Sequence, residues 1–262
     1  MSLAFPRSLV FLFVPCMLGG CAGRQVVVES RYSPTPPRGI VLVVDGAGGY
    51  QASPRAITAA VETARLPLYV RSFDWTLGDN LGVADMTDIA HARAQAHRLA
   101  EQVSWYRANY PTTPVYVIAH SAGTMVALES TQWLAPDSIE RIVLLAPAVS
   151  ADYDLRRALS TARQGIDVFT SRRDRLFLGL GTGVVGTADG KRGVPAAGRH
   201  GFDVPASTVN DVALASRLRQ HPWDPNVNWT GNFGEHSGSL RPDFLKAYVL
   251  PLLSAPVHAA YQ

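Results

Sequence analysis

The sequence predicts an α/β domain built on a mostly parallel, doubly wound β-sheet. Short runs of β-branched and aromatic residues alternate along the chain with longer segments of helical composition or periodicity. Several of these runs are continuously apolar, as expected for parallel strands buried on both faces. At 262 residues the chain is long enough for one large domain with a full core.

The first core strand is predicted at Ile40–Val44, which is continuously apolar. A helix should follow from Ser53 to about Ala64, because Ser53 can cap a helix and Pro54 suits its first turn. Leu68–Ser72 has the composition of the second strand. These three segments give the strand–helix–strand alternation of a parallel sheet.

A long helix and the central strand come next. Residues 73–86 predict a loop, and Thr87 or Asp88 should cap an amphipathic helix whose apolar residues recur at helical spacing. Val115–Ile118 predicts a buried strand. Thr124–Ser130 is rich in helix formers and predicts the helix after it.

The second half of the chain continues the alternation. Its predicted elements are strands at 142–145, 166–170 and 227–229 and helices at 152–162, 210–220 and 241–250. Residues 179–201 are dense in glycine and predict a surface loop; their G-x-G-x-x-G pattern at 181–186 lacks the following helix that a dinucleotide site needs. The excursion between Pro147 and Gly165 is too short for a large cap domain.

The turn around Ser121 is the most informative stretch. Only small residues and one His surround this serine, in the order Ala119-His120-Ser121-Ala122-Gly123. A sharp strand-to-helix turn needs this composition, because the serine is strained and the residues two positions away must lack bulk. Such a turn exposes Ser121 Oγ, and the start of the helix offers the Ala122 N–H to an oxyanion.

This turn resembles the G-x-S-x-G nucleophile elbow of the α/β-hydrolases, with Ala119 replacing the first glycine. Asp174 follows the strand at 166–170 and His236 follows the last predicted strand, so all three loops should open on one sheet edge. The order Ser…Asp…His is that of the α/β-hydrolases and differs from the chymotrypsin and subtilisin orders. The resemblance extends from about Ile40 onward and implies the α/β-hydrolase fold.

The resemblance implies a serine hydrolase of the esterase or lipase kind, acting on a carboxylic ester in a small molecule. Ser121 would be the nucleophile, His236 the base and acid, and Asp174 the group that orients His236. Neither a metal nor a cofactor is needed. Two alternatives remain open: a non-catalytic lipoprotein of this fold that binds a ligand or partner, and an acyltransferase with the same triad.

The resemblance also implies two oxyanion donors. Ala122 N–H is one, and the loop Asp45–Gly49 after the first strand implies the other, at Ala47 or, as the next choice, Gly46. The usual first residue of this loop is His, whereas this chain has Asp45.

Other residues compete for the acid and base roles. His200 is the rival base, and Asp152 or Asp154 could replace Asp174 as the acid. His221 is placed before the last predicted strand and is not expected to serve as the base. His120 either lines the pocket or merely packs beside the nucleophile.

The N-terminus predicts export. The apolar run Leu9–Leu18 is short for a membrane span, which needs about 20 apolar residues, and it suits a signal peptide. Leu18-Gly19-Gly20-Cys21 resembles a bacterial lipobox, which implies lipidation of Cys21 and membrane anchoring. Ala22 at the next position implies sorting to the outer membrane, on its periplasmic face.

The expected organisation is therefore a signal peptide at 1–20, a tether at 21–38 and the hydrolase domain at 39–262. The net charge of +3 is spread without basic blocks, so a nucleic-acid partner is not expected.

Overall fold

The computed structural model describes residues 28–29, 38–77, 82–174, 186–203 and 212–253. The expected signal peptide, Cys21 and nearly all of the tether lie outside the described residues. Residues 181–185 of the G-x-G-x-x-G pattern also lie outside them. In the described part of the chain, no helix combines the length and the hydropathy that a membrane span requires.

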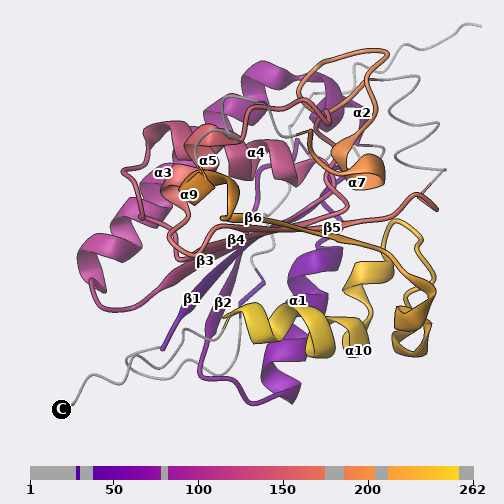
Figure 1. Ribbon diagram of the computed structural model, residues 1–262. Helices are drawn as coiled ribbons and strands as arrows, with labels where there is room; N and C mark the ends of the chain where they lie inside the picture. Colours follow the sequence, from indigo (N-terminus) through magenta and orange to yellow (C-terminus); the bar gives the residue numbers. More distant parts are fainter. Residues whose placement is uncertain (1–27, 30–37, 78–81, 175–185, 204–211, 254–262) are drawn as a thin grey trace, which may run out of the picture.

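Six parallel strands form one sheet in the order β2-β1-β3-β4-β5-β6 (Figure 1). They are β1 (Ile40–Val44), β2 (Tyr69–Phe73), β3 (Val115–His120), β4 (Arg141–Leu145), β5 (Ile166–Thr170) and β6 (Leu218–Pro222). The chain runs outward from β1 to β2, then returns to the other side of β1 and continues from β3 to β6. This winding confirms the predicted doubly wound parallel sheet, and it brings every carboxyl end to one edge.

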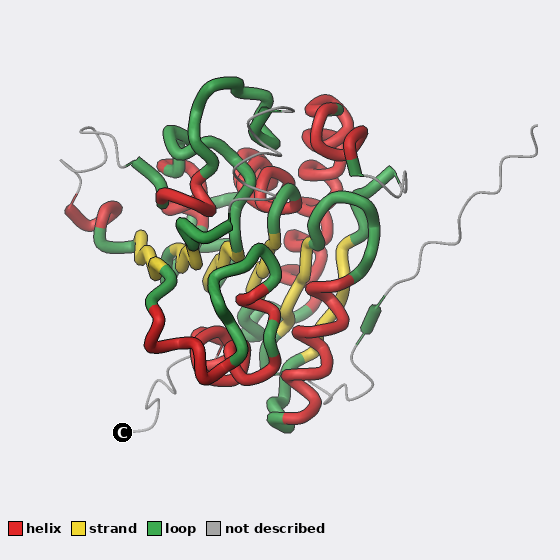
Figure 2. Tube along the Cα trace, turned by 90° about the vertical axis from the view of Figure 1, so that its right-hand side faces the viewer, coloured by secondary structure: helices red, strands yellow, loops and turns green. Residues whose placement is uncertain are grey.

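Helices cover both faces of the sheet (Figures 1 and 2). The α-helices are α1 (Ala52–Thr63), α2 (Val83–Thr87), α3 (Ile89–Asn109), α4 (Gly123–Ser130), α5 (Arg156–Thr161), α7 (Ala197–His200), α9 (Val212–Ala215) and α10 (Pro242–Phe244). Helices α1 and α10 lie on one side, and α3, α4, α5 and α9 lie on the other. A π-helical turn (Leu245–Val249) and a 3₁₀ helix (Leu250–Leu253) continue α10, and shorter 3₁₀ helices lie at Thr131–Trp133, Pro225–Thr230 and Gly238–Leu240.

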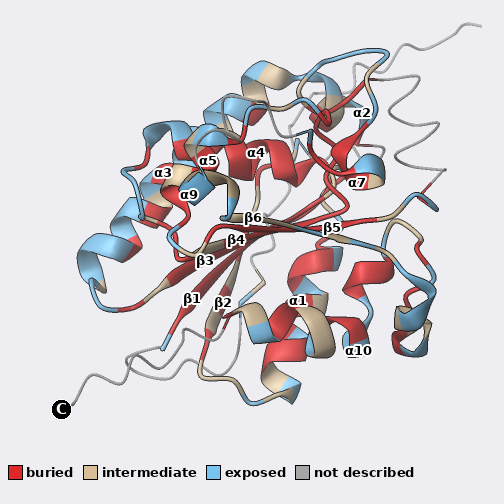
Figure 3. Cartoon of the chain, viewed as in Figure 1, coloured by how far each residue is buried: buried red, intermediate tan, exposed pale blue. Residues whose placement is uncertain are grey.

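The apolar strands divide their side chains between two core layers, and the buried residues gather along the sheet (Figure 3). Ile40, Leu42 and Val44 of β1 pack with α3 and α4, whereas Val41 and Val43 pack with α1 and the helical turns after α10. Both faces of the strand are therefore removed from water, which explains its continuous apolar sequence. Burying one such side chain contributes about 1.5–3 kcal/mol.

Two predicted elements near the C-terminus are wrong. The predicted helix at 210–220 is replaced by the short α9 and the edge strand β6, and the predicted strand at 227–229 lies in a 3₁₀ helix. Strand β6 reads Leu-Arg-Gln-His-Pro and is only partly buried, so it lacks the apolar run by which a strand is recognised. Its last residue, Pro222, is tolerated because β6 is the edge strand.

Smaller differences affect two other regions. The predicted loop at 73–86 contains most of α2, and the predicted helix at 152–162 shortens to α5. Residues 146–165, between β4 and β5, hold only this short α5, which agrees with the predicted lack of a cap domain at that point.

Candidate active site

Ser121 occupies a strained turn between β3 and α4. Its φ of 51° lies in the left-handed region, which a non-glycine residue rarely adopts. The turn is held because Ser121 N–H donates to Leu145 O at 3.0 Å and Thr124 Oγ1 donates to Ser121 O at 2.6 Å. A Cβ built on Gly123 would lie 2.2 Å from Asp45 O, so only glycine allows α4 to begin this close to the end of β1.

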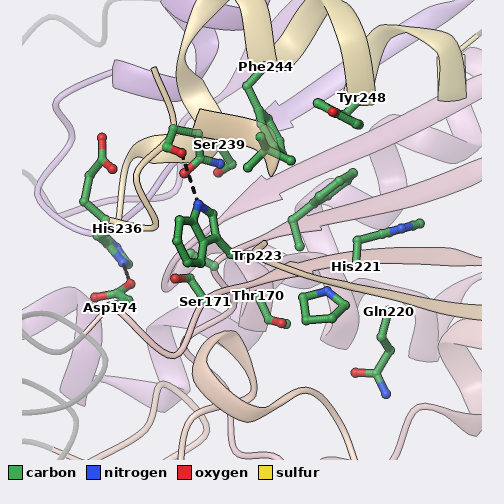
Figure 4. A pocket seen from close by; sticks show the side chains of 16 residues that line it. Thr170, Ser171, Asp174, Gln220, His221, Trp223, His236, Ser239, Phe244 and Tyr248 are labelled. Atoms are coloured by element: carbon green, nitrogen blue, oxygen red, sulfur yellow. Dashed lines mark hydrogen bonds and ion pairs between the residues drawn. The ribbon is translucent and has the colours of Figure 1, made fainter. Parts of the chain in front are cut away.

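The structure brings Ser121, His236 and Asp174 together at the carboxyl edge of the sheet. His236 Nε2 lies 2.9 Å from Ser121 Oγ, and its Nδ1 lies 2.5 Å from Asp174 Oδ2. Figure 4 shows the contact between His236 and Asp174. The Asp174 side chain is 2% exposed and the His236 side chain 11% exposed, so water competes little for their hydrogen bond.

The loops that carry the acid and the histidine are tied to each other. Ser171 Oγ, just after β5, donates to Gly234 O at 2.7 Å, and Asp174 N–H donates to Ser171 O at 3.1 Å. Asn232 Oδ1 in turn accepts from Gly234 N–H at 2.9 Å. These bonds fix the backbone on both sides of the His236–Asp174 contact.

His120 is buried and packs against His236. Its ring centroid lies 4.9 Å from that of His236, and its Nε2 is 3.2 Å from the His236 carbonyl oxygen. Burial, followed by the nearby His236 ring, lowers the pKa of His120 to about 4. A neutral His120 can donate from Nε2 to that carbonyl, so the structure favours a packing and positioning role for this residue.

The glycine-rich loop after β1 lies against Ser121. A Cβ built on Gly46 would be 3.2 Å from Ser121 Cβ and 3.8 Å from its Oγ. Ala122, the other expected donor, is fully buried at the start of α4. Among the described residues, neither Ala47 N–H nor Ala122 N–H has a hydrogen-bond partner.

Asp45 replaces the usual His of this loop and has a structural task. Its carboxylate accepts from the backbone N–H groups of Ala52 and Ser53, at 2.9 and 3.1 Å, and from Ser53 Oγ at 2.5 Å. These groups belong to the first turn of α1, whose amides lack partners within the helix. Ser53, predicted as the helix cap, is the second residue of the helix, and Asp45 satisfies the amides of the first turn instead.

The rival residues lie in other contacts. Asp152 is exposed and accepts from Lys191 Nζ at 2.7 Å, and Asp154 pairs with Arg156 at 2.6 Å. His200 is an exposed residue at the end of α7. The sequence analysis placed His221 before the last strand, but the residue lies within β6, which is the last strand.

His221 is held by a buried carboxylate that the sequence analysis did not identify. His221 Nε2 lies 2.8 Å from Asp167 Oδ1, and Arg141 and Arg219 also donate to Asp167. Burial opposes the ionisation of Asp167, but these three partners outweigh it and hold the pKa of Asp167 well below its usual range. The cluster joins β4, β5 and the edge strand β6.

A second residue missed by sequence reasoning is Asp85 on α2. It is buried, and its two carboxylate oxygens accept from Gly48 N–H and Leu77 N–H. No local pattern marks it, because Gly48 lies 37 residues away in the chain.

A cavity of about 330 Å³ adjoins the His236–Asp174 pair. Figure 4 shows it between the ends of β5 and β6, the loop that carries His236 and the segment with Phe244 and Tyr248. Most of its lining is apolar, including Phe169, and Ser121 is not part of it. No group of three potential metal ligands occurs among the residues that the structure describes.

Comparisons with known proteins gave a family match and several similar structures. Residues 83–174 match the model of the T6SS Tle3 phospholipase effector domain. The match includes Ser121 and ends at Asp174, whereas His236 lies beyond it. A comparison with curated proteins gave no match.

Several solved structures are similar to this chain at low sequence identity. An esterase from Pyrococcus furiosus has a TM-score of 0.49 and 13% identity, with 83% of this chain and 82% of that chain covered. An α/β serine hydrolase without a lid, from Xanthomonas campestris, has a TM-score of 0.46 and 15% identity, with 88% and 90% covered. Lipase B from Aspergillus fumigatus has a TM-score of 0.47 and 10% identity, with 81% and 52% covered.

The order of the structural elements settles the fold class. A strained serine follows the third strand of a parallel sheet, an aspartate follows the fifth, and a histidine follows the sixth and contacts both. The sequence predicts this order, and in the structure the three side chains are in contact through the histidine. The chain has the α/β-hydrolase fold.

Proposed function

We propose that this protein cleaves carboxylic esters through an acyl-enzyme formed on Ser121. The observation that carries the proposal is the unbroken series of contacts from Asp174 to His236 and from His236 to Ser121 Oγ. Both distances lie within hydrogen-bond reach, so a proton can move from Ser121 to His236 as Oγ attacks the ester carbonyl. Three polar groups linked in this way are arranged for acyl transfer, and the Ala122 and Ala47 amides beside them have no partner in the described part of the chain.

The reaction then has two halves. In the first, Ser121 Oγ bonds to the carbonyl carbon, and His236 passes the proton to the departing alcohol. In the second, water gives a proton to His236 and attacks the acyl carbon; His236 then returns that proton to Ser121 Oγ as the acid leaves. Asp174 stabilises the imidazolium in both halves, and the N–H groups of Ala122 and Ala47 stabilise the oxyanion.

The family match guides the choice of substrate. The matched model describes a phospholipase domain, so phospholipid esters should be tested beside short soluble esters. The glycerophospholipid acyl bond is a carboxylic ester, and the same attack by Ser121 would cleave it.

We also propose that the protein is exported and lipidated at Cys21, as the lipobox-like residues 18–21 predict. Acyl chains gain about 0.8 kcal/mol per buried CH₂, so several chains would attach the protein to the membrane almost permanently. Cys21→Ser should shift the protein from the membrane fraction or stall its processing. A variant that matures and partitions like the wild type would contradict the lipidation of Cys21.

Labelling with a fluorophosphonate, followed by peptide mapping, tests the nucleophile. The wild type should carry the label on Ser121, and Ser121→Ala should carry none while it keeps its circular dichroism spectrum. Ser104→Ala, at an exposed position on α3, is the matched control and should label normally. Labelling of Ser121→Ala, or a folded wild type that neither labels nor hydrolyses esters, would refute the proposed function.

The same preparation separates hydrolysis from acyl transfer. An added alcohol, such as glycerol, competes with water for the acyl-enzyme. If a new ester accumulates in preference to the free acid, the enzyme is an acyltransferase that uses the same triad.

A further inference from the structure

Asp85 links the loop after β1 to the segment after β2. Its Oδ2 accepts from Gly48 N–H at 2.7 Å, and its Oδ1 accepts from Leu77 N–H at 2.7 Å. The residue is 3% exposed, so water cannot easily replace either bond. Both carboxylate oxygens are therefore engaged with backbone groups, and one of these groups adjoins Ala47.

The start of α2 also touches this loop directly. A Cβ built on Gly82 would lie 2.8 Å from Ala47 Cβ and 3.0 Å from Gly48 N. The other side of the loop meets the nucleophile, because a Cβ on Gly46 would lie 3.2 Å from Ser121 Cβ. Residues 46–48 are thus enclosed between α2 and Ser121.

The loop needs such support because its own sequence gives it freedom. Gly48 and Gly49 have φ values of 94° and 68°, and glycine accesses many other conformations at little cost. An oxyanion donor must be held about 2.7–3.1 Å from the developing charge before the reaction occurs. A loop with two adjacent glycines does not hold a donor in this way unless its neighbours fix it.

We propose that Asp85 is a positioning residue that holds residues 46–48 so that the Ala47 N–H faces the oxyanion formed on Ser121. The inference rests on the proposed function, since it assigns a task within the same reaction. Asp85 does not touch the reacting atoms. It acts through the Gly48 amide, and its contribution should be confined to the transition state.

Three variants test this role. Asp85→Ala removes both acceptors, and Asp85→Asn keeps one acceptor but turns an NH₂ group toward the second amide. Asp88→Asn is the matched control three residues away, where the exposed Asp88 side chain caps α3 and Asn caps a helix equally well. Circular dichroism and thermal unfolding establish which variants are folded, and Asp85→Asn decides the question if Asp85→Ala does not fold.

Kinetics with p-nitrophenyl butyrate should separate positioning from general stability. The loss of an entire oxyanion donor lowers kcat about 10²–10³-fold, and a loosened donor should cost less, about 10-fold or more. We expect kcat to fall and KM to change little in the folded Asp85 variants, with Asp88→Asn unaffected. The inhibition constant of an alkyl trifluoromethyl ketone, which forms a tetrahedral adduct on Ser121, should rise by the factor by which kcat/KM falls.

Hydrogen exchange supplies a readout that does not depend on activity. The peptide covering residues 45–52 should exchange faster in Asp85→Ala and Asp85→Asn than in the wild type and Asp88→Asn. Unchanged exchange of this peptide, or an unchanged kcat in folded Asp85 variants of an active wild type, refutes the positioning role alone. A folded wild type that neither labels with fluorophosphonate nor hydrolyses esters refutes the proposed function and, with it, the task assigned to Asp85.

Discussion

Asp174→Asn tests the charge behind His236, the proposed catalytic base, while keeping the shape of the side chain. Asp174 Oδ2 lies 2.5 Å from His236 Nδ1, and the residue is 3% exposed, so water cannot substitute for the lost carboxylate. The amide NH₂ of Asn can donate to Nδ1, which would leave the proton on Nε2, where Ser121 needs an acceptor. We expect kcat to fall by up to about 10⁴, or about 5.4 kcal/mol of lost transition-state stabilisation, with little change in KM.

The assay is the hydrolysis of p-nitrophenyl butyrate by folded wild type, Asp174→Asn and Asp152→Asn. Asp152 is the matched control, because its carboxylate is exposed and paired with Lys191, and such ion pairs contribute about 0–1 kcal/mol. Asp152→Asn should keep nearly full activity. A kcat of Asp174→Asn within 10-fold of the wild type would refute the reasoning, and a large loss in Asp152→Asn alone would move the acid to the loop after β4.

Three further predictions concern stability and the turn. As the pH falls from 7 to 5, His120 gains a proton in the unfolded state but stays neutral in the folded state, where its pKa is about 4. The unfolding free energy should therefore decrease as the pH falls, by about 2 kcal/mol more in the wild type than in His120→Gln. Asp167→Asn should cost about 3 kcal/mol in urea unfolding because it leaves Arg141, whose side chain is only 13% exposed, without its carboxylate, whereas Asp137→Asn, in an exposed pair, should cost less than 1 kcal/mol. Gly123→Ala should abolish fluorophosphonate labelling, since its Cβ would overlap Asp45 O; labelling at the wild-type rate would contradict this.

Strands buried on both faces could be predicted from the sequence almost to the residue. The predicted bounds of β1 and β5 agree with the structure, because a continuous apolar run has few other uses in an α/β chain. Strand β6 was missed because it lies at the sheet edge and carries Arg219, Gln220 and His221. Contacts of Arg219 and His221 with Asp167 help to hold β6 beside β5. These contacts join residues more than 50 positions apart and leave no periodic pattern in the sequence.

The same distinction holds at the site. The contacts among Ser121, Asp174 and His236 could be predicted because each residue follows a strand and their chain order matches a known family pattern. His120 could not be assigned, because its role depends on contact with a ring 116 residues away. Asp85 gave no signal at all, since its partners are backbone amides, which any sequence provides.

The strained and enclosed positions of the fold gather where the chemistry is proposed. Ser121 and Ala146, at the ends of the neighbouring strands β3 and β4, both have positive φ values, and each amide is bonded across to the next strand. Such strain costs about 1–3 kcal/mol per residue and persists only where the surroundings enforce it. Here the enforcement comes from backbone bonds between neighbouring strands, and Asp85 of α2 accepts from the loop after β1, beside Ser121. The packed sheet thus holds Ser121 and the proposed donors Ala122 and Ala47 in place. Variants that loosen the carboxyl ends of the strands should therefore lose activity before they unfold.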